Sequence, residues 1–280
     1  MARSRTYIGV ATAAVACALL GLTGAPSARA SGSAPCPSGG TPPPGSTVTA
    51  GLEVDGFCTL TGVTVNGGIT VDPSFALANT VVLDGSTVNG GMVVGEGSGF
   101  ISGWDLDSGN LTHITSTING GLTLNTVGAF VAADMAVRGG FTMNGSYDWP
   151  SICGGDPDCF SPVPLCASEI WGDVTVRDVN TNELSVGDPN EPLFSNGDCA
   201  GNTIHGSLLI SDTHFLSAHG DPTEIEGNTV GGSVHLDNSS AEVNGNTIGG
   251  SLLCAEGGFL RAPLSPDFPG NVVAGTDTCS

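Results

Sequence analysis

A nine-residue pattern that returns along most of the chain constrains its fold more than any other feature. In the copy at 63–71, Val63, Val65, Ile69 and Val71 share one face, while polar residues and glycine take the other. This period of two predicts strands with one face buried. Clear copies lie at 63–71, 86–94, 116–124, 202–210, 228–236 and 246–254, and weaker copies lie at 46–54, 135–143 and 168–176.

Each copy has a glycine at its centre, where no side chain can pack. Such a glycine predicts a bend between two short strands or a close backbone approach. The anchors are Gly67, Gly90, Gly120, Gly139, Gly172, Gly206, Gly232 and Gly250, at spacings of 23, 30, 19, 33, 34, 26 and 18 residues. Units this short cannot bury their own apolar face, and the variable period indicates stacking with insertions.

We therefore expect an all-β fold, a parallel β-helix (β-solenoid). Spacings near 18 suit one coil, and longer ones are either a coil plus a loop or two coils. We expect one buried column that contains Val65, Val88, Ile118, Ile204, Val230 and Ile248.

A second signal precedes the late copies. The turn dipeptides are Gly201-Asn202, Gly227-Asn228, Gly245-Asn246 and Gly270-Asn271. Glycine and asparagine both tolerate left-handed dihedrals. Stacked coils would align the asparagines, so their amides could bond from coil to coil. The alternative is four unrelated surface turns.

These repeats resemble a group of secreted actinomycete β-helix repeat proteins, mostly uncharacterised. Those chains carry Gly-Asn-Thr-(Val/Ile)-x-Gly-(Asn/Ser)-Leu repeats, an early cysteine pair, and a last repeat ending in cysteine before a cysteine-terminated tail. The matching residues are Cys36 and Cys58, the three late repeats, and Cys254 with Cys279. The resemblance covers most of 46–280 and is weakest at 144–169. It implies the fold and export, and no activity.

The N-terminus has the features of a secretory signal peptide, which we place at 1–30. Arg3 and Arg5 precede an apolar run, and Ala28-Arg-Ala30 is a small-x-small cleavage site. A membrane anchor is the alternative, but the apolar run is short for a spanning helix. A Pro/Gly/Ser-rich leader at 31–45 follows, and the solenoid is expected over 46–280.

Cysteine usage agrees with export. Eight cysteines remain once Cys17 leaves with the signal segment, and an even count in an exported chain predicts disulfides. We expect the pairs Cys36–Cys58 and Cys254–Cys279 at the two ends. The other four are expected to pair among themselves, in an arrangement that the sequence leaves open: Cys153, Cys159, Cys166 and Cys199. Zinc at three of these is the competing interpretation, but there is no Cys-x-x-Cys pair.

The charge of the chain excludes some partners. After removal of 1–30, three arginines and no lysine face 27 acidic residues, a formal charge of −24. Nucleic acid and anionic lipid surfaces are therefore not expected as partners. We expect no cofactor, with calcium as a weaker alternative.

Three segments interrupt the repeat, near 95–115, 144–169 and 178–201. The stretch 178–182 places oxygen-bearing side chains at alternate positions, as calcium loops do, but lacks the glycine and glutamate of the hand-type loop. An ordinary polar loop is the other interpretation. The segments also hold three aromatic residues that are candidates for stacking on sugar rings: Trp104, Tyr147 and Trp149.

We searched for catalytic groups because many parallel β-helices are polysaccharide lyases or hydrolases. The carboxylates and histidine that a carbohydrate-active site could use are Asp105, Asp107, Asp156, Asp158, Asp178 and His219. They support an enzyme only if they converge in one groove with an aromatic residue. No residue is assigned a catalytic, cofactor-binding or metal-binding role, and an enzyme is the less favoured interpretation.

The outward positions of the repeat offer a binding surface. Threonines are expected in one column, with asparagines beside them in the first copies: Thr64, Thr87, Thr117, Thr203, Thr229, Thr247, Asn66, Asn89 and Asn119. Regular ladders can order water, although any exposed strand face of high β-propensity looks similar. The sequence thus favours an exported, non-catalytic scaffold or adhesion module at the cell surface. The alternative is a carbohydrate-binding or carbohydrate-active β-helix whose site lies on the inserted loops.

The tail after Cys254 is expected to fold over the last coil. It carries enough apolar residues to cover a core, and Pro263, Pro266 and Pro269 disfavour a regular inner strand. We therefore expect a cap held by a Cys254–Cys279 disulfide.

Overall fold

The structure is a computed structural model. It describes residues 34–36, 42–74, 77–105, 110–146, 163–181, 184–187, 199–215, 223–260 and 269–279. The expected signal peptide at 1–30 lies outside these ranges. The same holds for eight of the candidate residues: Asp107, Tyr147, Trp149, Cys153, Asp156, Asp158, Cys159 and His219.

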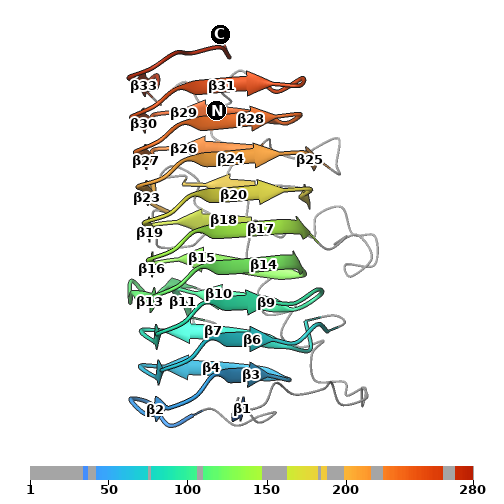
Figure 1. Cartoon of the computed structure of the whole chain (residues 1–280), viewed down its shortest axis with the longest axis vertical. Coiled ribbons are helices and arrows are strands. Elements are labelled where there is room, and N and C mark those ends of the chain that lie inside the picture. Colours follow the sequence, from blue (N-terminus) through green and yellow to red (C-terminus); the bar gives the residue numbers. More distant parts are fainter. Residues whose placement is uncertain are drawn as a thin grey trace.

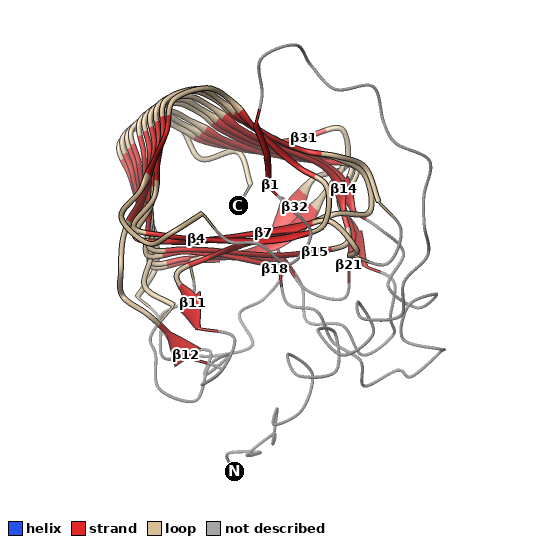
Figure 2. Cartoon of the chain, turned by 90° about the horizontal axis from the view of Figure 1, so that it is seen from below, coloured by secondary structure: helices blue, strands red, loops and turns tan. Residues whose placement is uncertain are grey.

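The described chain is a parallel β-helix, as predicted. Three large sheets run along one long axis, with neighbouring strands stacked as successive rungs (Figure 1). Viewed along that axis, the three sheets enclose the core (Figure 2). The part of the chain that the structure describes contains strands and no helix.

Each coil passes through sheets B, A and C in turn. Sheet A contains β1 (Ala34–Cys36), β3 (Leu52–Val54), β6 (Ile69–Val71), β9 (Met92–Val94), β14 (Leu122–Val127), β17 (Phe141–Ser146), β20 (Val174–Arg177), β24 (Leu208–Ser211), β28 (Val234–Asp237) and β31 (Leu252–Ala255). Sheet B contains β2 (Thr47–Val48), β5 (Thr64–Val65), β8 (Thr87–Val88), β13 (Ser116–Ile118), β16 (Met135–Val137), β19 (Glu169–Ile170), β23 (Thr203–Ile204), β27 (Thr229–Val230), β30 (Thr247–Ile248) and β33 (Val272–Val273).

Sheet C contains β4 (Phe57–Thr61), β7 (Thr80–Asp84), β10 (Gly99–Ser102), β15 (Ala129–Ala133), β18 (Val163–Cys166), β22 (Leu184–Val186), β26 (Thr223–Glu226), β29 (Ser240–Asn244) and β32 (Phe259–Leu260). Two strand pairs lie outside these sheets. The antiparallel pair is β11 (Trp104–Asp105) with β12 (Asn110–Leu111), and the parallel pair is β21 (Asn180–Thr181) with β25 (His214–Phe215).

The bend expected at each anchor glycine is confirmed. In the copy at 63–71, β5 belongs to sheet B and β6 to sheet A, and Gly67 lies in the turn between them. A Cβ on Gly67 would lie 2.5 Å from the backbone nitrogen of Gly51 in the previous coil. Glycine is therefore required because the two turns stack backbone on backbone.

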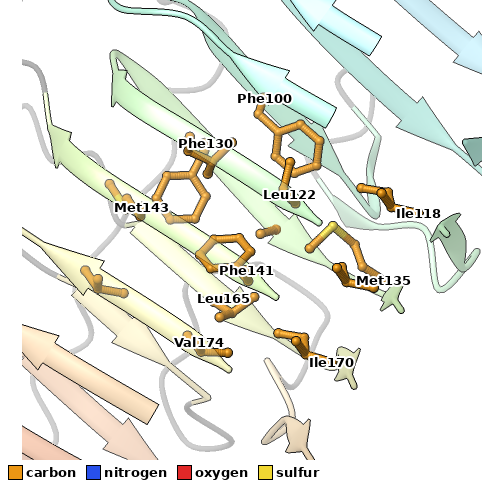
Figure 3. Close-up of a cluster of buried hydrophobic side chains, with 14 of the residues drawn as sticks. Phe100, Ile118, Leu122, Phe130, Met135, Phe141, Met143, Leu165, Ile170 and Val174 are labelled. Atoms are coloured by element: carbon orange, nitrogen blue, oxygen red, sulfur yellow. The ribbon is translucent and has the colours of Figure 1, made fainter. Parts of the chain in front are cut away.

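The predicted core column is confirmed. Its members are register neighbours in sheet B and are at most 1 % exposed: Val65, Val88, Ile118, Val137, Ile170, Ile204, Val230 and Ile248. In the middle of the solenoid, Phe130 of sheet C reaches toward Phe141 of sheet A (Figure 3). The rings of Phe130 and Phe141 are 6.4 Å apart, so side chains from facing sheets fill the interior.

The predicted asparagine ladder is also confirmed. The side-chain amide nitrogen of each asparagine donates to the side-chain oxygen of the next, from Asn202 to Asn228 (2.9 Å), Asn228 to Asn246 (3.0 Å) and Asn246 to Asn271 (3.0 Å). Gly227 and Gly245 have the expected positive φ values of 67° and 65°. Gly201 and Gly270 are not among the residues with positive φ.

Serine continues this ladder in the early coils. Ser86 Oγ accepts a hydrogen bond from the Val63 amide (3.0 Å) and donates to the Leu60 carbonyl (2.6 Å). Ser168 Oγ likewise accepts from the Met135 amide (3.1 Å). The interior turn between sheets C and B is therefore hydrogen-bonded from coil to coil in early and late rungs alike.

Three disulfides join described cysteines. Cys36–Cys58 ties β1 to β4 at one end and Cys254–Cys279 ties β31 to the tail at the other, as predicted. Cys166–Cys199 pairs two of the remaining cysteines. The strand β1 falls within 31–45, so part of the segment expected as a leader belongs to the solenoid.

The expectation that the tail avoids a regular strand is wrong. Val272 and Val273 form β33 in register with β30, so the tail adds a rung to sheet B. The Val272 and Ala274 amides donate to the carbonyls of Asn246 (2.8 Å) and Ile248 (2.9 Å). Pro269 lies before this strand, so it removes no ladder donor.

The three predicted insertions are narrower than expected. Each range contains a strand of sheet C: β10 in 95–115, β18 in 144–169 and β22 in 178–201. Every anchor spacing, including the longest, is therefore one coil with loops. Sequence inspection missed these strands because they carry neither the central glycine nor the threonine of the repeat.

Candidate functional site

The turn from sheet B to sheet A has the same length in every coil. Three residues separate each sheet B strand from the next sheet A strand, from 49–51 in the first coil to 249–251 in the last. The connections at the other two corners vary from one residue, between β14 and β15, to sixteen, between β17 and β18. Every insertion therefore leaves from those two corners.

We call the outward residues of sheet B and these three-residue turns the sheet B face. Its ten strands, spaced about 4.8 Å apart, span roughly 43 Å. The predicted threonine column is confirmed there, since Thr64, Thr87 and Thr117 are register neighbours, as are Thr203, Thr229 and Thr247. Ala136 and Glu169 interrupt it.

A second column lies beside the threonines, at the first residue of each turn. The main-chain amide of each member donates to the carbonyl of the last residue of the sheet B strand one coil earlier. Trp171 donates in this way to Val137 (2.9 Å) and His205 to Ile170 (2.8 Å). We call this the turn column. Its members are Asn66, Asn89, Asn119, Arg138, Trp171, His205, Gly231 and Gly249.

The first three members form an exposed amide ladder. Asn119 donates to Asn89 (2.7 Å), and Asn89 donates to Asn66 (2.9 Å), in each case from Nδ2 to Oδ1. All donors point toward the N-terminal end. The ladder therefore ends at Asn119 with a carbonyl oxygen on the side of Arg138.

The next three members form a stack. The guanidinium carbon of Arg138 lies 4.7 Å from the centroid of a Trp171 ring. The rings of Trp171 and His205 are 5.4 Å apart and inclined by only 22°. His205 Nε2 lies 3.0 Å from Glu169 Oε1, which fixes the orientation of the imidazole. Sequence inspection missed this stack, because its members are 33 and 34 residues apart.

The sheet B face carries little net charge although the chain is strongly acidic. Its ionisable residues are Arg138, Glu169, Asp173 and His205, so both signs are present. Among the residues that the structure describes, no carboxylate lies within ion-pair distance of Arg138. In a chain with 27 acidic residues, this arginine is held by an aromatic ring instead.

The described members of the predicted carbohydrate site do not converge. Trp104 is 8 % exposed and packs in a second hydrophobic cluster with Leu111, Ala133 and the Cys166–Cys199 pair, so it has a structural role. Asp105 lies in β11, after sheet C. Asp178 follows β20 of sheet A and has a φ of 54°. Asp105 therefore lies between sheets C and B, whereas Asp178 lies between sheets A and C.

Sheet C carries carboxylates that sequence inspection missed. Glu224 and Glu242 are register neighbours, and Asn244 Nδ2 donates to Glu226 (3.2 Å) and Glu242 (2.9 Å). Glu226 and Glu242 are 4 % and 2 % exposed. The asparagine therefore holds two buried carboxylates in a structural network.

One carboxylate has a perturbed pKa. Asp134, between sheets C and B, has its pKa raised from 3.8 by burial, and the nearby His113 opposes part of that change. The Nδ1 atom of His113 lies 3.7 Å from Asp134 Oδ2. Asp134 has a φ of 51°, at the position where Gly62 and Gly85 also have positive φ.

Within the described ranges, no cluster of three or more histidine, cysteine, aspartate or glutamate residues is arranged to hold a metal ion. Nor does any helix there have the length and hydrophobicity needed to cross a membrane. The fold defines the class of the protein as a disulfide-linked parallel β-solenoid. No protein-family model, curated protein or solved structure matches the chain.

Proposed function

We propose that the protein is an exported, non-catalytic β-solenoid that acts as a rigid extracellular scaffold or adhesion module, with the sheet B face as its contact surface. The observation that carries this proposal is the constant three-residue turn between sheets B and A. A solenoid tolerates insertions wherever a loop projects freely. Their restriction to two corners leaves one long regular surface beside them.

Two further observations support export and rigidity. Three disulfides join described cysteines, which is typical of extracellular proteins. Side-chain ladders inside and outside the turns link consecutive coils, so the contact surface keeps its spacing. The resemblance of the repeats to secreted actinomycete β-helix proteins points in the same direction.

Adhesion through this face is tested with matched triple variants of the mature protein. Thr203→Lys, Thr229→Lys and Thr247→Lys place three long cations on consecutive rungs of the sheet B face. The control places lysine at Thr123, Thr142 and Thr175, also on consecutive rungs, in sheet A. Both sets are outward and cost little stability.

We expect the unmodified protein to sediment with insoluble cell-wall and polysaccharide preparations, the sheet A triple to sediment equally, and the sheet B triple to remain in solution. Equal binding by both triples, with unchanged melting temperatures, contradicts the proposal. N-terminal sequencing of the exported chain tests the signal peptide, and a mature chain starting at Ser31 is expected.

A second candidate function is carbohydrate binding, and the Arg138–Trp171–His205 stack favours it. The carbohydrate-active form of this alternative predicts release of reducing sugars or unsaturated products from polysaccharides, with or without calcium. Binding without any product favours the non-catalytic proposal, whereas turnover by the pure protein overturns it.

A further inference from the structure

The Arg138 guanidinium is a fixed group, and no described residue accepts a hydrogen bond from it. Its contact among the described residues is the face of Trp171, at 4.7 Å, and a cation over an aromatic ring keeps its N–H groups at the edge of the contact. The side chain is exposed. The carbonyl oxygen that ends the Asn66–Asn89–Asn119 ladder is one rung away. Donors and an acceptor therefore lie side by side on the surface.

Trp171 is a positioning residue in this arrangement. Arg138 is one rung before it and His205 one rung after it, so both ring faces are engaged. The tryptophan orders the two flanking side chains, which lowers the entropy lost when they bind a ligand. It contacts a ligand with its edge at most.

His205 presents the open end of the stack. One face of its ring lies against Trp171, and Nε2 is engaged by Glu169. The other face looks along the turn column toward Gly231 and Gly249, which are exposed and have no side chains. A Cβ on Gly231 would lie 2.5 Å from the His205 carbonyl oxygen, so the backbone keeps this step free of side chains.

The chemistry of this column fits a neutral polyhydroxylated chain. Amide and guanidinium groups hydrogen-bond hydroxyls, and an open aromatic face packs against the C–H face of a sugar ring. A formal charge of −24 on the mature chain repels polyanions. A surface that binds another protein usually has exposed apolar residues at its centre. The exposed large hydrophobic residues of the described chain lie away from the stack: Phe57, Val93, Ile114 and Val272.

We propose that the turn column from Asn119 to Gly249 binds a neutral polysaccharide lying along the solenoid axis. A sugar ring stacks on the open face of His205 above Gly231, and hydroxyls of neighbouring units bond Arg138 and Asn119. The site spans five rung steps, or roughly 24 Å, and so takes several sugar units. This inference rests on the proposed function, because it names the ligand of the same face.

Affinity electrophoresis of the mature protein in gels containing soluble polysaccharides tests the inference. Neutral arms are xylan, mannan, a mixed-linkage glucan and hydroxyethyl cellulose, and acidic arms are polygalacturonate and alginate. We expect retardation in at least one neutral gel and none in the acidic gels. Retardation confined to acidic gels, or absent from all, overturns the inference.

Single variants locate the site. Arg138→Ala and His205→Ala should each weaken retardation about tenfold, as expected for loss of a hydrogen bond to a charged group or of a stacking face. Trp171→Ala should weaken it similarly, whereas Trp171→Phe should restore most of it, because a phenyl ring still supports both neighbours. Arg177→Ala and His235→Ala, on the outer side of sheet A, are the matched controls and should bind normally.

Two outcomes separate this inference from the proposed function, and a third contradicts the location of the site. If the sheet B lysine triple abolishes sedimentation with cell walls while no neutral polysaccharide is bound, the contact face stands and the ligand assignment fails. If protease treatment of the wall material removes binding, the partner is a protein and the inference is overturned. If all six variants bind alike and melt alike, the turn column is not the site.

Discussion

The interior asparagine ladder gives a prediction of stability that can be worked from individual hydrogen bonds. Asn228 is 1 % exposed and lies in the middle of the ladder. Its Oδ1 accepts from both the main-chain and the side-chain nitrogen of Asn202, each at 2.9 Å. Its Nδ2 donates to the Val186 carbonyl (2.6 Å) and to Asn246 Oδ1 (3.0 Å). The variant Asn228→Ala removes all four bonds.

The loss in the free energy of unfolding of Asn228→Ala follows from the buried groups that are left without a hydrogen-bond partner. The two Asn202 donors lose their shared acceptor, and the Val186 carbonyl loses a donor. Asn246 Oδ1 keeps the Asn228 main-chain amide at 2.9 Å, and Asn202 Nδ2 keeps the Leu165 carbonyl at 2.8 Å. Each buried group left unpaired costs about 1–3 kcal/mol. Partial relaxation lowers the sum, so we expect Asn228→Ala to lose about 3–5 kcal/mol.

The early coils supply a graded control. Ser86 occupies the equivalent position and keeps one accepted and one donated bond, to Val63 and Leu60. Asn228→Ser should therefore lose only about half as much as Asn228→Ala. Asn228→Asp should lose more stability than Asn228→Ser, because a buried carboxylate cannot donate a hydrogen bond to the Val186 carbonyl. Thr229→Ala, one residue on and exposed, should change stability by less than about 0.5 kcal/mol.

The assay is unfolding in guanidinium chloride with the disulfides intact, followed by far-ultraviolet circular dichroism. Native-state hydrogen exchange should show faster exchange of the Asn202 amide in Asn228→Ala. The reasoning is refuted if Asn228→Ala unfolds within about 1 kcal/mol of Thr229→Ala, or if the serine and aspartate variants reverse their order.

Three further predictions concern the core, the C-terminal end and pH. Ile204→Asp buries an unpaired charge in the sheet B column and should cost more than about 4 kcal/mol, which a soluble variant with unchanged melting would contradict. Replacing Cys254 and Cys279 by serine opens a loop of 25 residues and should cost about 3 kcal/mol and favour oligomers in gel filtration. Because burial raises the pKa of Asp134, its contribution to stability is present at low pH and is lost as pH rises through the raised value. Asp134→Asn should therefore stabilise the fold more at pH 7 than at pH 3, measured by urea unfolding at both values.

The repeat made part of the fold predictable from the sequence. Alternation around Val65 and Ile69 defines which residues face the core, because a strand has a period of two. The recurring Gly-Asn turns predicted the interior ladder, since only stacking in register brings those amides together. The disulfides Cys36–Cys58 and Cys254–Cys279 were predicted because these cysteines lie at the two ends of the repeat region.

Sheet C could not be predicted in the same way. Its strands β10, β18 and β22 carry no glycine or threonine signature, and their lengths and outward residues differ from coil to coil. Their neighbours in sheet C follow from the order of the coils, which is the same in sheets A and B. The tail was misjudged for a related reason: Pro269 precedes β33, and a count of prolines does not show on which side of a strand they fall.

The Arg138–Trp171–His205 stack is not a requirement of the fold. Asn66, Asn89 and Asn119 occupy the same column with the same backbone hydrogen bonds, and the exposed amide ladder they form is a complete solution for that position. Gly231 and Gly249 are set by the backbone instead, because a Cβ on either would lie 2.5 Å from the carbonyl oxygen of the residue one coil earlier. Because the column accepts asparagine, arginine, tryptophan and histidine with the same backbone hydrogen bond, neither core packing nor turn geometry accounts for the choice among these four. What distinguishes the stack is what it presents to solvent, and the test of its purpose is therefore binding, with stability as the control.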